Sequence, residues 1–294
     1  MYNSKATISS INFKQVARAL TIVENDLTES AELLKNLTFN KPTPIIGITG
    51  PPGAGKSTLV NELINNLLKE GNKIAVLAID PTSPFNFGSL LGDRIRMASH
   101  FNHPDVFIRS LATRGSLGGL SVKTIEMADV LRAAGFDYVL IETVGVGQSE
   151  VEITGLADFT LVVLVPEAGD EIQHIKSGLM EIADAFIVNK ADRADADIFF
   201  NNLKKITSQN KEEQTQIFKT VASQAIGIDE VTAFIKSSAS QKNQRRELLL
   251  TQKAYQLIQH KLTRHIDKKK LQHAIAEALN TEGFNLYSFV DGYL

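Results

Sequence analysis

IIGITGPPGAGKSTLVNELINNLLK, residues 45–69, decides the fold of this chain. It opens with an apolar run of strand type at 45–49 and passes into a glycine-rich loop. An amphipathic segment follows from Lys56 to Lys69, and Gly71 ends it. The loop fits G-x-x-x-x-G-K-[ST], in which backbone N–H groups wrap a polyphosphate and the helix N-terminus adds its dipole. Strand, loop and helix in this order predict a nucleotide site.

The predicted phosphate-binding residues share that loop. The Lys56 side chain is expected to reach the β- and γ-phosphates and to act in catalysis. The Ser57 hydroxyl is expected to ligate Mg²⁺. The full predicted set is Gly50, Pro51, Pro52, Gly53, Ala54, Gly55, Lys56, Ser57 and Thr58.

Apolar runs and amphipathic segments alternate after the loop. Continuous apolar runs indicate strands that are buried on both faces. Strands that alternate with helices predict an α/β fold with a mostly parallel central sheet flanked by helices. The remaining strand-like runs are 73–79, 106–111, 138–142, 159–165, 185–189 and 216–222, with a helix at 121–134.

We expect three parts in the chain. Residues 1–41 form a helical extension that ends in the breaker KPTP, and 42–238 form the nucleotide-binding domain. Residues 239–294 form a helical arm, after a linker-like stretch SSASQKNQ at 237–244. In the arm, Leu248, Tyr255 and Leu262 are seven residues apart, which permits helix pairing.

Composition excludes several classes of function. The 294 residues carry a formal net charge of −2, so no global basic field attracts nucleic acid or anionic lipid. Zero cysteines remove disulfides, thiolate metal sites and cysteine nucleophiles. No apolar stretch approaches the roughly 18–20 residues that span a bilayer. The expectation is a soluble, cytoplasmic protein without nucleic-acid or membrane partners, whose histidines are structural or solvent-facing.

The tetrapeptide at 189–192, NKAD, predicts which base is bound. It follows a predicted strand, and open α/β sheets bind ligands at the carboxyl ends of their strands. The Asp192 carboxylate can accept from guanine N1–H and from the exocyclic amine, whereas adenine presents an acceptor at N1. GTP is therefore favoured over ATP. The predicted base contacts are Asn189, Lys190 with its aliphatic stem on the base, Asp192, and the backbone N–H groups of Val221, Ala222 and Ser223.

The strand YVLIE ends in a carboxylate and is followed by Thr143-Val144-Gly145, which fits a [DE]-x-x-G element. Glu142 is expected to hold Mg²⁺ through water, and the Gly145 N–H to sense the γ-phosphate. Val146 cannot orient a water molecule, so Gln148 is the candidate. We expect slow intrinsic hydrolysis that a partner accelerates. Asp80 and Asp93 are further candidate Mg²⁺ carboxylates, with an exposed loop acid as the alternative for each.

Longer strings carry a family resemblance. AIDPTSPFNFGSLLGDRIRM, AGFDYVLIETVGVGQSEVEI, LVVLVPEAGDEIQHIKSGLMEIAD and NKADR resemble the MeaB/ArgK family over about residues 12–236. These are GTPases associated with adenosylcobalamin-dependent methylmalonyl-CoA mutase, within a wider group of metallochaperone GTPases. The sequence departs from the family at Phe87-Gly88, where two glycines are usual, and at Val221, where serine is usual.

The resemblance implies roles for particular segments. Asp80, Asp93 and Glu142 would serve Mg²⁺, with Asp93 in switch I, residues 145–150 in switch II, and 167–176 in a third switch that senses the mutase. The C-terminal arm would make a homodimer. GTP binding and hydrolysis would gate adenosylcobalamin loading into an acyl-CoA mutase such as methylmalonyl-CoA mutase, and this chain would meet the cofactor only through that partner.

Three alternatives stay open. A nickel metallochaperone GTPase of the same fold needs soft or imidazole ligands, which zero cysteines and scattered histidines disfavour. A transport-associated ATPase or a kinase would prefer ATP, against residues 189–192. A binding module without turnover is the third.

Overall fold

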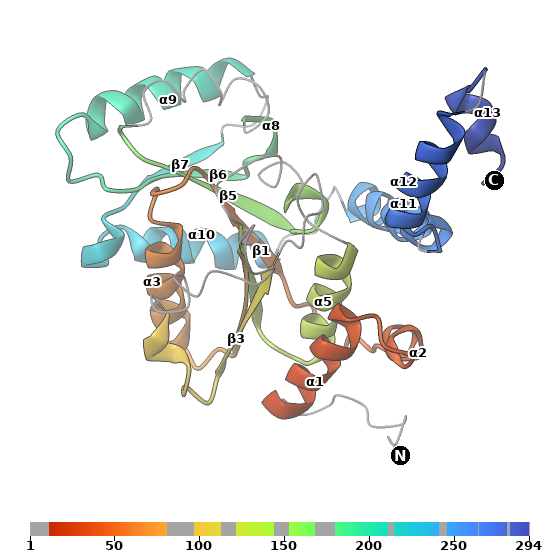
Figure 1. The fold of residues 1–294 in the computed structure, drawn as a ribbon. Helices are drawn as coiled ribbons and strands as arrows, with labels where there is room; N and C mark the ends of the chain where they lie inside the picture. Colours follow the sequence, from red (N-terminus) through yellow and green to blue (C-terminus); the bar gives the residue numbers. More distant parts are fainter. Residues whose placement is uncertain are drawn as a thin grey trace. The chain divides into compact units, whose positions relative to one another are not determined.

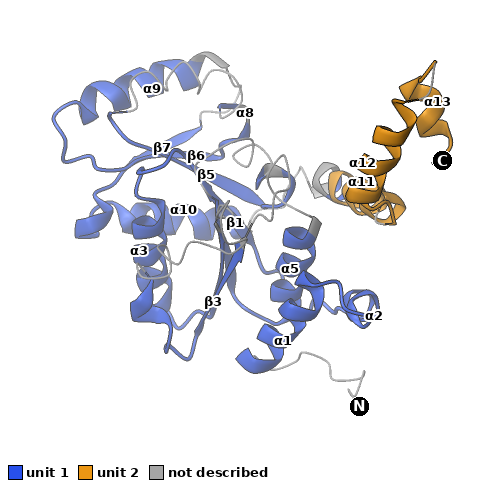
Figure 2. Ribbon diagram, in the orientation of Figure 1, with its two compact units in different colours: residues 1–250 blue, residues 251–294 orange. Residues whose placement is uncertain are grey.

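The computed structural model describes residues 12–80, 97–112, 122–143, 153–167, 180–210, 215–240, 246–263, 265–280 and 283–293. The chain divides into two compact units, Met1–Leu250 and Thr251–Leu294, which Figure 2 colours separately. Each is described by itself below.

A seven-stranded sheet forms the centre of the first unit (Figure 1). Its spatial order is β3-β2-β4-β1-β5-β6-β7, and every described pairing is parallel. All the carboxyl ends therefore meet at one edge, and the predicted α/β class is confirmed. The strands are β1 Ile45–Thr49, β2 Ile74–Asp80, β3 Val106–Ala112, β4 Tyr138–Glu142, β5 Phe159–Leu164, β6 Ala185–Val188 and β7 Gln216–Lys219.

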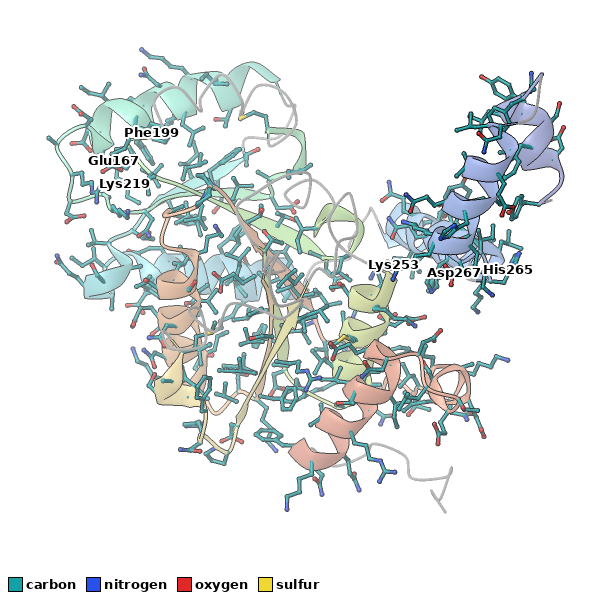
Figure 3. The ribbon with its side chains drawn as sticks, viewed as in Figure 1. Glu167, Phe199, Lys219, Lys253, His265 and Asp267 are labelled. Carbon is teal, nitrogen blue, oxygen red and sulfur yellow. The ribbon has the colours of Figure 1, made fainter. Side chains whose placement is uncertain are left out.

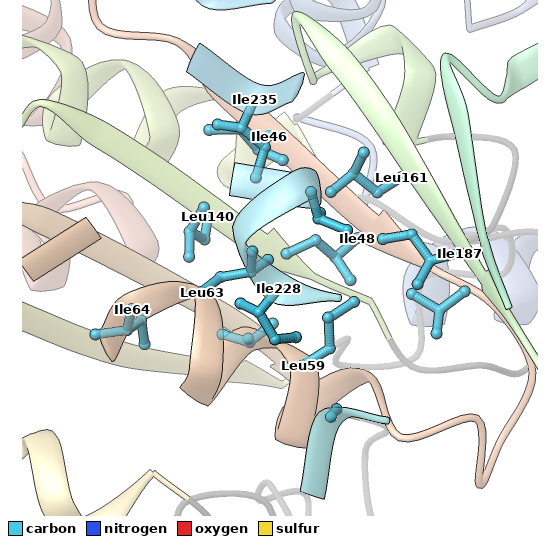
Figure 4. Close-up of a cluster of buried hydrophobic side chains, with 14 of the residues drawn as sticks. Ile46, Ile48, Leu59, Leu63, Ile64, Leu140, Leu161, Ile187, Ile228 and Ile235 are labelled. Carbon is cyan, nitrogen blue, oxygen red and sulfur yellow. The ribbon is translucent and has the colours of Figure 1, made fainter. Parts of the chain in front are cut away.

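Helices cover both faces of the sheet because alternate strand residues point to opposite sides. On β1, Ile46 and Ile48 join the apolar cluster under α3 (Lys56–Leu68) and α10 (Ile228–Ser240), shown in Figure 4. Ile45 joins the opposite cluster. That cluster packs under α1 (Phe13–Glu24), α2 (Ser30–Lys35) and α5 (Val122–Ala133), while α8 (Met180–Ile182) and α9 (Ala196–Asn210) cover β5 and β6.

Gly47 is where β1 meets a short 3-10 turn, η2 (Ile153–Gly155). A Cβ at Gly47 would lie 2.5 Å from Ile153 Cγ1 and 3.0 Å from Ala157 Cβ. The missing side chain lets this turn pack directly on the central strand. It follows that the segment entering β5 is fixed against the strand that leads into the glycine-rich loop.

Two predicted boundaries differ from the structure. Strand β7 ends at Lys219 rather than at 222, because the Val221 N–H turns to the Ile226 carbonyl and the Ala222 N–H to Asn189 Oδ1. Helix α10 continues through Ser240, so residues 237–240 of the expected linker are helical. Ile228, Val231 and Ile235 supply the buried face that extends this helix. Residues 241–245 lie outside the described part of the chain.

The second unit contains α12 (Lys268–Ala278), α13 (Leu286–Asp291) and most of α11 (Arg246–Thr263). The Asp267 and Asn285 side chains cap α12 and α13 by accepting from backbone N–H groups. At Asp267, the hydrogen bonds from the Lys270 and Lys269 N–H groups lower the pKa of the carboxyl. α12 and α13 have no buried residue. None of the helices that the structure describes is both long and apolar enough to span a bilayer.

His100 is a buried imidazole in the first unit, at the end of the turn η1 (Ala98–His100). It is 4% exposed, and its Nε2 has no hydrogen-bond partner among the described residues. Burial, followed by the nearby His103, lowers the pKa of His100, against smaller opposing effects of the Asn61 backbone and Glu62 on α3. The folded state therefore holds this imidazole neutral.

We predict that His100 makes the fold less stable in mild acid. An unfolded histidine titrates near 6.5, so below that pH the unfolded chain binds more protons than the folded chain. The free energy of unfolding should fall as the pH drops from 7 toward the lowered pKa. His100→Gln should flatten this slope in urea titrations between pH 5 and 7. The exposed His273 gives the control His273→Gln, and equal slopes in both variants would contradict the prediction.

Candidate nucleotide site

The glycine-rich loop leaves β1 and enters α3 at the carboxyl edge of the sheet. Gly50 has φ 139°, and a Cβ there would lie 2.0 Å from the Val163 carbonyl oxygen of β5. Gly55 has φ 86°, and its Cβ would lie 2.4 Å from Asn189 Nδ2. Gly53 also has a positive φ, but its Cβ would meet nothing within 4 Å. The loop is thus packed tightly at both ends and open in the middle, where a polyphosphate would approach.

The Lys56 ammonium lies over this loop. Its Nζ donates to the Gly50 carbonyl at 2.8 Å and to the Pro51 carbonyl at 2.9 Å, and the residue is 7% exposed. A buried ammonium needs such acceptors. Phosphate oxygens are stronger acceptors for a charged donor than neutral carbonyls. The position therefore suits a lysine that transfers its hydrogen bonds to a bound phosphate.

A hydroxyl and a carboxylate meet next to it. Ser57 Oγ donates to Glu142 Oε1 at 2.6 Å, and both residues are buried. The register that pairs Ile48 with Glu142 brings the end of β4 alongside the loop. Thr143 extends the link, because its Oγ1 donates to Thr49 Oγ1 at 2.8 Å. Hydroxyl and carboxylate oxygens are ligands that Mg²⁺ accepts, so this pair fits that ion.

Asn189 joins the loop to the predicted base-binding segments. Its Nδ2 donates to the Ala54 carbonyl at 2.8 Å. Its Oδ1 accepts from Thr220 Oγ1 at 3.0 Å and from the Ala222 N–H at 3.1 Å. The residue is 2% exposed, so these bonds form away from water. One side chain therefore sets three loops, which leave β1, β6 and β7, relative to one another.

The turn after Asn189 carries the predicted base contacts. Lys190 has φ 56°, its carbonyl accepts from the Arg193 N–H at 3.1 Å, and the Ala191 N–H donates to the Thr220 carbonyl at 3.0 Å. Asp192 lies exposed within this turn and Lys190 is half-buried. The Ala222 N–H is already bonded to Asn189, whereas Ser223 is exposed. The turn thus offers an accessible carboxylate three residues after Asn189, which bonds to the phosphate loop.

Several predicted residues cannot be placed in this site. Asp93, Gly145 and Gln148 lie outside the described residues, as do 168–176 of the predicted third switch. Asp80 is described only as the last residue of β2, which β4 separates from β1. Within the described ranges, no group of three or more His, Asp or Glu side chains is placed to hold a metal ion.

Sequence reasoning missed two contributors to the site. Thr49 and Thr143 are buried, and their hydroxyl pair joins the ends of β1 and β4. No sequence pattern marks a contact between residues so far apart. Asn189 was predicted as a base contact, but its part in holding Ala54 was not. The sequence does indicate such a role, because a side-chain amide that follows a fully buried strand needs hydrogen-bond partners for both its NH₂ group and its carbonyl oxygen.

Residues 16–278 match the model of the family described as Methylmalonyl Co-A mutase-associated GTPase MeaB. The chain belongs to this family. It is accordingly a nucleotide-binding GTPase, as the resemblance predicted.

Similar proteins agree with this assignment. A Pyrococcus horikoshii protein with the name of a GTPase is 49% identical over 232 residues, which cover 76% of this chain and 73% of that protein. The mitochondrial methylmalonic aciduria type A homolog of Mus musculus is 38% identical over 60% of this chain and 46% of its own length. A solved LAO/AO transport system kinase superposes with TM-score 0.68 and 26% identity, covering 99% of this chain and 95% of that one.

We predict that Asn189→Ala weakens GTP binding about 10- to 100-fold. The substitution removes three buried hydrogen bonds and leaves the Ala54 carbonyl and the Ala222 N–H without their partner. Calorimetry with GTP and Mg²⁺ measures the effect. The matched control is Asn72→Ala at the far end of α3, where Asn72 Nδ2 donates to the Leu67 carbonyl at 2.9 Å. Equal GTP affinities for both variants would contradict the assigned role.

Proposed function

We propose that this GTPase is a chaperone whose GTP cycle gates adenosylcobalamin loading into an acyl-CoA mutase such as methylmalonyl-CoA mutase, and protects the loaded enzyme. The observation that carries the proposal is the match of residues 16–278 to a family described by its association with that mutase. The name of the mouse relative, which refers to methylmalonic aciduria, points the same way. This chain would meet the cobalamin only through the mutase.

The geometry of the loop and its neighbours supports the proposed nucleotide contacts. The open middle of residues 50–58 would bind the phosphates through backbone N–H groups, and Lys56 would neutralise the β- and γ-oxygens. Asp192 would accept from guanine N1–H and the exocyclic amine, and Lys190 would cover the base. Asn189 would act mainly through the loops that it joins.

Ser57 and Glu142 would hold Mg²⁺, Glu142 through water, with Asp80 and Asp93 as further carboxylates. The ion would supply positive charge against the phosphate oxygens. Glu142 also fixes the Ser57 hydroxyl at 2.6 Å, which orders the start of α3. Gly145 and Gln148 are proposed for sensing the γ-phosphate and orienting water. Hydrolysis would be slow until a partner completes the positioning on which phosphoryl transfer depends.

We also propose a homodimer through the C-terminal arm of residues 239–294. On α11, Tyr255, Ile258 and Leu262 are 62%, 54% and 67% exposed, and their spacing of three and four places them along one side of the helix. Large apolar side chains gathered this way are typical of association surfaces. The proposed division into an extension (1–41), a GTPase domain (42–238) and an arm (239–294) is inferred from the sequence alone.

Two other functions remain to be tested. A transport-associated ATPase or kinase has in its favour the solved transport system kinase that shares this fold at 26% identity. It predicts ATP preference and phosphate transfer to an acceptor. A nickel-type metallochaperone predicts stoichiometric Ni²⁺ binding by the isolated protein. Comparison of GTP with ATP, and a Ni²⁺ titration, separate both from the proposal.

We predict that Asp192→Asn changes the preferred base. The NH₂ group of Asn would face the exocyclic amine at C2 of guanine, which is also a donor. Xanthine carries a carbonyl at C2, which can accept from this NH₂ group. GTP affinity should fall at least about tenfold, and XTP affinity should rise, because a lost charge-assisted hydrogen bond costs about 1.5–3 kcal/mol. Competition binding with GTP, XTP and ATP measures this. An unchanged GTP preference in the variant would remove the basis for guanine selection by Asp192.

We predict that the partner mutase accelerates GTP hydrolysis and that GTP gates cofactor transfer. Phosphate release is measured for the full chain with and without methylmalonyl-CoA mutase from the same organism, alongside adenosylcobalamin incorporation into apo-mutase. A nonhydrolysable GTP analogue should block the gated step, and Lys56→Ala should lose the stimulation. If the mutase neither binds nor changes turnover in any nucleotide state, the chaperone proposal fails, although the GTPase assignment stands.

A further inference from the structure

An ion pair joins the loop after β5 to the turn of residues 190–193, called here the base-recognition turn for its predicted base contacts. Glu167, labelled in Figure 3, pairs with the Arg193 guanidinium. The two loops start side by side, because Leu164 pairs with Val188 at the carboxyl ends of β5 and β6. Both side chains are 47% exposed. The contact therefore links two strand-end loops at the surface of the predicted nucleotide site.

Arg193 directly follows Asp192, the carboxylate proposed to select guanine. The turn is closed by the bond from the Arg193 N–H to the Lys190 carbonyl, so the two side chains leave the same short segment. Another cation at this edge, Lys219, is engaged elsewhere. It pairs with Asp197 and lies 4.5 Å from the centre of the Phe200 ring. Lys190 lies in the same turn but is half-buried, so Arg193 is the exposed cation of this turn next to the exposed carboxylate.

An arginine beside such a carboxylate is a competitor for the base. Its planar guanidinium forms two parallel hydrogen bonds to the two carboxylate oxygens. Guanine needs the same oxygens for its N1–H and its exocyclic amine. A guanidinium free to turn toward Asp192 would therefore occupy the acceptors that distinguish guanine from adenine.

We propose that Glu167 is a specificity-determining positioning residue, which holds the Arg193 guanidinium away from the Asp192 carboxylate. Glu167 then keeps Asp192 available as an acceptor without touching the nucleotide itself. The inference rests on the proposed role of Asp192 in guanine selection. It gives Glu167 a function within this chain that is independent of any partner.

The test compares Glu167→Gln with the double variant Glu167→Gln/Arg193→Gln. Glu167→Gln releases Arg193, so GTP affinity should fall about two- to fivefold, the size expected for an exposed ion pair. ATP affinity should not fall, because adenine makes no such contacts with Asp192. Removing the guanidinium in the double variant should restore the GTP:ATP ratio. Competition binding at constant Mg²⁺ and low salt measures all of these affinities.

Two outcomes would overturn the inference. One is a Glu167→Gln variant with an unchanged GTP:ATP ratio. The other is a double variant as impaired as Glu167→Gln, which would mean that the pair only braces the turn. Glu70→Gln is the matched control, since Glu70, just after α3, pairs with Lys236 of α10 at similar exposure, 48% and 42%. Asp192→Asn in the same assay tests the proposed guanine contact separately, because it removes the carboxylate and leaves the Glu167–Arg193 pair in place.

Discussion

The hydrogen bond from Asn189 Nδ2 to the Ala54 carbonyl is the contact on which the site depends. The phosphate loop and the base-recognition turn leave different strands, β1 and β6, with β5 between them. Parallel pairing alone aligns the strands but leaves the loops beyond them unconstrained. Asn189 supplies the missing constraint, and its Oδ1 extends it to the turn after β7. The predicted phosphate and base contacts thereby share one hydrogen-bonded framework.

The glycines of the loop follow from this framework. Because Asn189 lies against Gly55 and the Val163 carbonyl lies against Gly50, neither position has room for a Cβ. Their positive φ values also favour glycine. Below the loop, α3 packs on the sheet through the buried side chains of Leu59, Leu63 and Ile64. Packing below the loop and hydrogen bonding above it therefore fix the start of the helix from two sides.

Local patterns were sufficient to predict the layers of the fold, because the strands were short apolar runs and the helix after the glycine-rich loop carried one apolar face. They failed where a distant group decides the local structure. QIFKTVA reads as one strand, yet it ends at Lys219 because the Val221 N–H bonds to the Ile226 carbonyl and the Ala222 N–H to Asn189. The Thr49–Thr143 and Glu167–Arg193 contacts are likewise invisible in sequence, since they depend on strand order and register.

The polar groups of the site are already bonded within the protein, and this shapes how a ligand can bind. Lys56 donates to loop carbonyls and Ser57 donates to Glu142. Phosphate and Mg²⁺ would replace these hydrogen bonds. The net free energy of binding is therefore smaller than the energy of the new contacts alone. The phosphates are also common to ATP and GTP. Discrimination between the two must therefore come from the base, which is the contact that we propose for the exposed Asp192 carboxylate.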